Sequence, residues 1–183
     1  MTELLGFGQP LGGIMEVAYV VPDLEEAMGH WTRELGVGPW FRFNHFPLAN
    51  ASYRGTPCEM DIDLALGFSG TMCFELIRQN DDQPSVYMDI VNKRGYGFHH
   101  WAISTRDFDG DIKRYEAMGA PMALYGEVPP VEARAAYMDT SKTLGGMIEL
   151  IEINDKVDAF FTTMYQAAQG WDGKTDPVRT MEG

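Results

Sequence analysis

The chain has 183 residues, of which 45% are hydrophobic, and its 27 acidic and 14 basic residues give a formal net charge of −13. This length suits one domain or two small fused modules, and the hydrophobic fraction is ordinary for a globular protein. The acidic balance argues against nucleic acid and against an anionic membrane surface as partners, because binding to phosphates needs a basic face.

The N-terminus gives no sign of export or membrane insertion. Residues 1–5 (MTELL) lack the basic segment and long apolar run of a signal peptide. No apolar stretch reaches the roughly 20 residues that a membrane-spanning helix needs. The two cysteines, Cys58 and Cys73, offer neither a disulfide framework nor metal-binding spacing. We therefore expect a cytoplasmic protein.

A first module is predicted over residues 13–78 with the order strand, helix, strand, strand, strand. Residues 14–21 form an apolar strand, and Asp23 is a good N-cap for a helix that runs to about Leu35 with apolar residues at three- and four-residue spacing. Residues 48–55 are interpreted as a turn. Three further segments are predicted to be strands of this module: residues 41–46, 61–66 and 71–78.

A second module, residues 97–153, repeats this order. It begins with a strand over residues 98–105, and Asp107 caps the helix that follows. His99 and His100 are adjacent on that strand and are expected to face opposite sides of the sheet, with His99 packed or solvated. Three segments are predicted to complete the module: residues 121–126, 133–139 and 147–153.

The remaining segments connect or follow the modules. Residues 79–96 are polar and interrupted by proline and glycine, and we interpret them as a linker with one or two helical turns. Residues 154–170 are predicted to form a helix with an apolar face that packs on the body or on a partner subunit. Residues 171–183 are interpreted as a flexible tail. All segments together are expected to form one compact domain.

Four polar residues interrupt apolar strands at equivalent places in the two modules: Glu16, Glu75, His100 and Glu149. An offset of 84 residues aligns His100 with Glu16, and an offset of 74 aligns Glu149 with Glu75. A charge on the inner face of a curved sheet is unfavourable unless it is paired or coordinated. One such residue is an ordinary solvent-facing charge, whereas four at matched points indicate a shared site.

Three segments resemble the vicinal oxygen chelate superfamily, which includes glyoxalase I, methylmalonyl-CoA epimerase, extradiol dioxygenases and bleomycin- or fosfomycin-resistance proteins. They are residues 17–25 (VAYVVPDLE), 97–103 (GFHHWAI) and 145–152 (GGMIELIE). The first is most similar to the glyoxalase-like and methylmalonyl-CoA epimerase-like branch. The resemblance implies an α+β fold in which two tandem βαβββ modules form a curved, cup-shaped mixed sheet with helices on its outer face.

Carried over by position, the resemblance implies that Glu16, Glu75, His100 and Glu149 hold a divalent metal, namely Mg²⁺, Mn²⁺, Co²⁺ or Zn²⁺. Such a metal stabilises an enolate of the substrate, and Glu149 or Glu16 is then the proton-transfer base. Many metal-dependent members have histidine where this chain has Glu16. Three carboxylates favour the harder metals and disfavour the iron chemistry of dioxygenases. No organic cofactor is implied.

Two functions from different classes follow. The first is a glyoxalase-like lyase or isomerase/epimerase that acts on a small carbonyl or carboxyl compound. The second is a metal-free protein that binds and sequesters an apolar or aromatic small molecule. Without metal, three carboxylates in one cup repel one another, and at least one is expected to be protonated near neutral pH.

The resemblance also implies a homodimer, in which one chain forms the cup or a partner completes it. Four other residues fall on or near the predicted strands and are further candidates for the rim or for substrate contact, which the sequence does not rank: His45, Tyr53, Arg54 and Tyr137.

Overall fold

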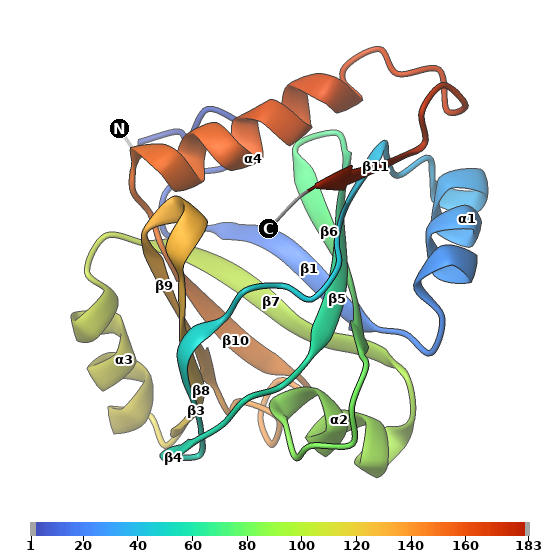
Figure 1. The fold of residues 1–183 in the computed structure, drawn as a ribbon. Helices are drawn as coiled ribbons and strands as arrows, with labels where there is room; N and C mark the ends of the chain where they lie inside the picture. Colours follow the sequence, from blue (N-terminus) through green and yellow to red (C-terminus); the bar gives the residue numbers. More distant parts are fainter. Residues whose placement is uncertain (1–2, 182–183) are drawn as a thin grey trace.

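The computed structural model describes residues 3–181, which build an 11-stranded mixed sheet with four α-helices around it (Figure 1). The strands are β1 (Ile14–Val20), β2 (Trp40–Phe43), β3 (Ala49–Tyr53), β4 (Thr56–Pro57), β5 (Ile62–Ser69), β6 (Met72–Gln79), β7 (Gly97–Thr105), β8 (Met122–Val128), β9 (Ala133–Met138), β10 (Met147–Glu152) and β11 (Val178–Met181). The helices are α1 (Leu24–Leu35), α2 (Val86–Arg94), α3 (Phe108–Ala117) and α4 (Asp155–Ala168), with a 3-10 turn at Pro129–Val131.

The centre of the sheet shows the internal repeat directly. The strand order is β11-β2-β5-β6-β1-β7-β10-β9-β8-β3-β4. β1 and β7 pair antiparallel in the middle, and each has the last strand of its own half as a parallel neighbour. Ala18 lies opposite Glu75 in the β1–β6 pair, and Ala102 lies opposite Glu149 in the β7–β10 pair. Both halves therefore use the same register, and the expected α+β fold with a curved sheet is confirmed.

Two helices cover the outer face of the sheet, as the resemblance implies. α1 begins at the N-cap Asp23, whose carboxylate accepts a hydrogen bond from the Glu26 amide. Its Met28 packs with Leu76 of β6 in one outer cluster. Phe108 at the start of α3 packs with Leu150 of β10 in the other outer cluster. These clusters bury the outward side chains of the strands that carry the site.

The inner face is also covered, because α2 and α4 pack into the largest hydrophobic cluster. α4 lies across one open end of the curved sheet (Figure 1), and its buried Val157, Phe161 and Met164 join this inner cluster. Val86 and Tyr87 of α2 join it from the opposite end. The predicted C-terminal helix thus packs on its own chain.

Two segments differ from the sequence-based expectations. Residues 48–55 contain β3, which pairs antiparallel with β8, and only residues 54–55 turn, where Arg54 has φ 48°. Part of the expected tail, residues 171–183, is ordered as β11, which pairs in parallel with β2. An exposed edge strand offers unpaired backbone groups, and β11 supplies partners for those of β2. Residues 182–183 lie outside the described residues.

Within residues 3–181, no helix is both long and apolar enough to span a membrane.

Candidate active site

Four adjacent central strands each deliver one of the expected polar residues: β6 carries Glu75, β1 carries Glu16, β7 carries His100 and β10 carries Glu149. All four side chains are buried. The distances from His100 Nε2 are 3.1 Å to Glu149 Oε2, 3.5 Å to Glu75 Oε2 and 3.8 Å to Glu16 Oε1. The structure therefore brings the four sequence-derived candidates to one point, which we call the quartet.

The alternation of side chains along a strand explains this placement. On β6, Cys73 and Ile77 belong to the inner cluster, whereas Phe74 and Leu76 pack on the outer side toward α1. Glu75 falls on the inner side of the same alternation and lines the cavity there. A shift of one residue in register would turn the carboxylate into the outer hydrophobic layer.

Three members of the quartet have the donor set and spacing for a cation. One oxygen each of Glu16 and Glu75 and one nitrogen of His100 lie within 4.8 Å of one another. Glu75 Oε2 and His100 Nε2 are buried, and neither has a hydrogen-bond partner of suitable geometry among the described residues. Buried polar atoms without partners are unfavourable. The residues present therefore fit a divalent cation.

The protonation of the quartet follows from its burial and its crowded charges. Burial lowers the pKa of His100, but the carboxylates of Glu149 and Glu16 outweigh burial and raise this pKa to about 10. Burial raises the pKa of Glu16, and burial together with the charge of Glu16 raises the pKa of Glu75 well above its usual value. Without a cation, the quartet therefore retains protons at neutral pH.

A β-bulge places His99 beside His100 instead of on the opposite face. In the β1–β7 pair, Ala18 pairs with His100 and Tyr19 pairs with Phe98, so His99 is the extra residue. The expectation that the two histidines face opposite sides is therefore wrong. Their Nδ1 atoms lie 2.9 Å apart, and both rings are fully buried.

The hydrogen bonds of His99 fix which nitrogen of His100 keeps its proton when the His100 ring is neutral. His99 Nε2 lies 2.9 Å from the carbonyl oxygen of Val86, which can only accept, so this nitrogen is the donor. Burial lowers the pKa of His99 to about 3, so the ring is neutral and its Nδ1 accepts from His100. His100 consequently presents Nε2 to the three carboxylates.

Two buried tyrosines complete the polar surroundings. Tyr137 of β9 stacks edge-on against His100 with ring centroids 4.9 Å apart, and its hydroxyl lies 3.3 Å from that of Tyr87. Burial raises the pKa of both hydroxyls well above 10, so both remain neutral. Sequence analysis named Tyr137 but missed Tyr87, which lay in the expected linker. The signal was Ser85, whose hydroxyl caps α2 by accepting from the Met88 amide.

The quartet opens into a cavity of about 90 Å³. Glu16, Glu75 and Glu149 lie in its wall together with both tyrosines. The rest of the wall is almost entirely apolar and includes Phe160 and Phe161 of α4. Polar groups that converge in an otherwise apolar cavity are the usual character of a small-molecule site.

The other sequence candidates do not line this cavity. The largely exposed ring of His45 pairs with Asp61, with Nδ1 2.7 Å from Oδ1. Tyr53 and Arg54 both bind Asp89 of α2, at 2.8 Å and 2.7 Å. These contacts fasten the β3–β4 turn to α2.

Fold and site together define a cup-shaped protein whose paired modules deliver four polar residues to one point. Residues 15–141 match the Glyoxalase/Bleomycin resistance protein/Dioxygenase superfamily. The chain belongs to this superfamily, and the resemblance read from its three segments is confirmed. A search of curated proteins found no match.

Solved structures share the fold at low sequence identity. Methylmalonyl-CoA epimerase from Mycobacterium tuberculosis is 22% identical, with a TM-score of 0.57 over 81% of this chain and 93% of that chain. A variant of the Streptomyces coelicolor methylmalonyl-CoA epimerase in complex with 2-nitronate-propionyl-CoA is 18% identical, with a TM-score of 0.55 over 79% and 96%. The hypothetical protein BH1468 from Bacillus halodurans C-125 is also 18% identical, with a TM-score of 0.54 over 78% and 95%.

Proposed function

We propose that this protein is an enzyme that moves a proton on the carbon beside a carbonyl or carboxyl group of a small compound. It acts as a glyoxalase-like isomerase, epimerase or lyase. One observation carries the proposal: three buried carboxylates lie in the wall of an apolar cavity, beside the buried imidazole of His100. Burial of several titratable groups shifts their pKa values toward those useful in acid–base catalysis, and such clusters mark functional sites.

Within this proposal, Glu149 is the proton-transfer base. Glu149 lies in the cavity wall, so it can contact a substrate bound there. Glu149 Oε2 is 3.1 Å from His100 Nε2, and the two groups form an ion pair when the imidazole is protonated. In the metal-free site Glu16 is the second carboxylate able to carry a proton, because burial raises its pKa.

Glu16, Glu75 and His100 are the residues that would hold a divalent metal, with Glu149 beside them. When bound, the metal neutralises negative charge that develops on a substrate oxygen during enolisation. Tyr137 and Tyr87, whose hydroxyls are neutral, also line the cavity. They donate a hydrogen bond to an oxygen of the bound substrate.

Two of the similar structures described above are methylmalonyl-CoA epimerases, a class whose name denotes inversion at a carbon centre. This supports proton transfer on carbon as the reaction type. The expectations of a homodimer and of a cytoplasmic location remain predictions.

The proposal is tested by hydrogen exchange in D₂O, followed by proton NMR, with a panel of hydroxyketones, diketones, 2-oxo acids and acyl-CoA esters. We expect catalysed exchange at the α-carbon of at least one compound and a loss of about 10²- to 10⁴-fold in Glu149→Gln. Glu152→Gln is the matched control, because Glu152 lies on the same strand but binds Arg134 on the outer face. Undiminished exchange in Glu149→Gln would refute the assignment. Stoichiometric binding of a compound without exchange would favour the sequestration function instead.

A further inference from the structure

The polar residues in the cavity wall are mainly acidic. Three carboxylates lie in its wall, and His100 is the basic group that faces them. A substrate carboxylate in this largely apolar cavity would lie beside these acidic side chains and would lose its hydration.

The wall also offers no free cation to an anionic substrate. Of the described residues that line the cavity, Arg134 is the only lysine or arginine. On β9, Ala133 and Tyr137 belong to the inner cluster, whereas Ala136 packs in the outer cluster beside α3. By this alternation the Arg134 side chain points outward, away from the cavity that its backbone adjoins.

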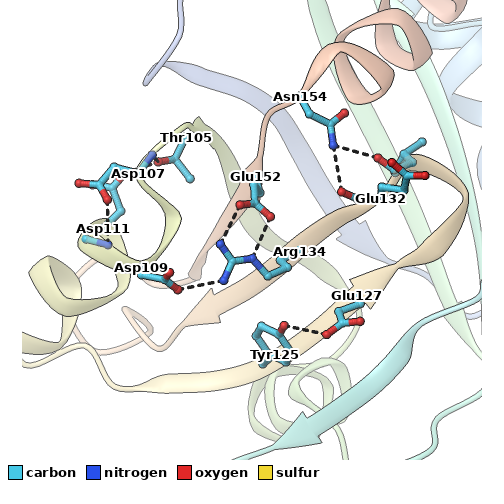
Figure 2. A network of polar contacts seen from close by, with 12 residues as sticks. Thr105, Asp107, Asp109, Asp111, Tyr125, Glu127, Glu132, Arg134, Glu152 and Asn154 are labelled. Carbon is cyan, nitrogen blue, oxygen red and sulfur yellow. Dashed lines mark hydrogen bonds and ion pairs between the residues drawn. The ribbon is translucent and has the colours of Figure 1, made fainter.

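Figure 2 shows where the guanidinium of Arg134 goes. It binds both carboxylate oxygens of Glu152, at 2.8 and 2.7 Å, and Asp109 at 3.0 Å. Its Cζ lies 4.5 Å from the ring centroid of Phe108. The bidentate pair with Glu152 and the bond to Asp109 occupy the guanidinium donors that would otherwise bind a substrate anion. Arg134 therefore serves the packing of α3 on the sheet.

The far wall of the cavity is built by α4. Phe160 and Phe161 line it, and Phe160 is only half-buried and packs on Phe43 with ring centroids 5.7 Å apart. The cavity volume of about 90 Å³ is smaller than the roughly 150 Å³ of an apolar cavity known to hold benzene. These aromatic side chains thus set the size of the substituent that the cavity accepts.

We infer that the substrate of the reaction is an uncharged carbonyl compound with a short apolar substituent, whose apolar end lies against Phe160 of α4. This inference rests on the proposed function and adds the substrate class. It predicts discrimination against carboxylates and against CoA esters, whose phosphates would meet no free arginine or lysine in the wall.

The charge argument is tested with 2,3-pentanedione and 2-oxobutanoate, which differ in a methyl group that replaces a carboxylate oxygen. NMR titration of the intact protein should show the dione binding at least about tenfold more tightly. Equal or tighter binding of 2-oxobutanoate would overturn the inference. Failure of the dione to bind both the wild type and Phe160→Ala would overturn it too.

The α4 argument is tested with the larger dione 1-phenyl-1,2-propanedione. Phe160→Ala should bind it at least about tenfold more tightly than the wild type, because the truncated side chain enlarges the cavity. The matched control is Tyr165→Ala, an α4 aromatic that packs on Phe68 and does not line the cavity. An equal gain in both variants, or no gain in Phe160→Ala, would contradict the placement.

The two proposals fail in different ways. If a carboxylate or a CoA ester binds more tightly and undergoes Glu149-dependent hydrogen exchange, the substrate class is wrong and the proposed function stands. If the diones bind as described here but no compound exchanges in a Glu149-dependent manner, the proposed reaction is wrong and the ligand class of the cavity stands.

Discussion

His99 acts on the quartet without facing the substrate cavity. It occupies the extra position of the β-bulge, and its ring is hydrogen-bonded between the Val86 carbonyl and His100 Nδ1, both at 2.9 Å. A histidine ligand is held in one tautomer and one orientation by the partner of its other nitrogen. The bulge therefore keeps Nε2 of His100 available to a cation.

Replacement of His99 should weaken metal binding while the quartet itself is intact. His99→Phe removes the acceptor beside His100 Nδ1, and we expect the Kd for Mn²⁺ or Zn²⁺ to rise about 10- to 100-fold. His99→Asn retains an oxygen acceptor and should recover part of the affinity. Calorimetric titration measures the Kd, and ¹⁵N NMR of His100 reports its tautomer. Wild-type affinity and an unchanged tautomer in His99→Phe would contradict this role.

Glu75 should make the metal-free protein less stable as the pH rises. Burial raises its pKa in the folded state, so the folded state binds more protons than the unfolded state and loses stability once the pH exceeds the unfolded value of about 4.5. Glutamine cannot ionise. Between pH 4 and pH 8, we expect the free energy of unfolding of Glu75→Gln to gain about 1–3 kcal/mol relative to the wild type.

This pH dependence is measured by urea denaturation in the presence of EDTA. Glu152→Gln supplies a control of opposite sign, because the ion pair with Arg134 lowers the pKa of Glu152 and its stabilising effect is lost as the pH falls. If the stability of Glu75→Gln relative to the wild type stays constant or declines between pH 4 and pH 8, ionisation of Glu75 does not destabilise the folded protein.

At the scale of elements, α4 both covers the inner face of the sheet and forms the far wall of the cavity. Phe161 is 4% exposed and packs against Phe7 with ring centroids 5.4 Å apart. Phe161→Ala should therefore lower the free energy of unfolding by about 3–5 kcal/mol in chemical denaturation. The exposed Thr163 on the same helix is the control, and Thr163→Ala should change stability by less than about 0.5 kcal/mol. A loss below about 1 kcal/mol for Phe161→Ala would mean that α4 is weakly docked.

The sequence predicted those helices and strands whose ends are marked by local signals such as capping residues and glycines. α1 has a capping aspartate and a glycine in the left-handed conformation at its end, Gly36 with φ 67°. β3 and β11 were missed because their stability comes from distant partners, β8 and β2, and edge-strand pairing leaves little trace in a short sequence window. The β-bulge at His99 was missed for the same reason, since a bulge is a relation between two strands.

At the scale of the whole molecule, the repeat explains why the quartet was predictable and its surroundings were not. Glu16 and His100 hold matched positions on β1 and β7, and Glu75 and Glu149 hold matched positions on β6 and β10. Because the strand register is the same in both halves, residues at matched positions of the sequence repeat come together in the structure. Tyr87 has no counterpart in the repeat, because α2 lies between the two halves.

The same topology predicts the stoichiometry of metal binding. The sequence allowed a cup completed by a partner subunit, whereas the structure takes all four members of the quartet from one chain, within 3.8 Å of His100 Nε2. Each chain should therefore retain one metal ion in the quartet, whether or not it dimerises, and dilution that dissociates a dimer should leave that ratio unchanged.

Native mass spectrometry over a range of protein concentrations, together with elemental analysis after dialysis against Mn²⁺ or Zn²⁺, measures the number of metal ions per chain. His100→Ala should abolish retention, whereas His30→Ala should not, because His30 pairs with Glu34 on the exposed side of α1. One ion per two chains, or loss of metal on dimer dissociation, would show that a second chain contributes to the site.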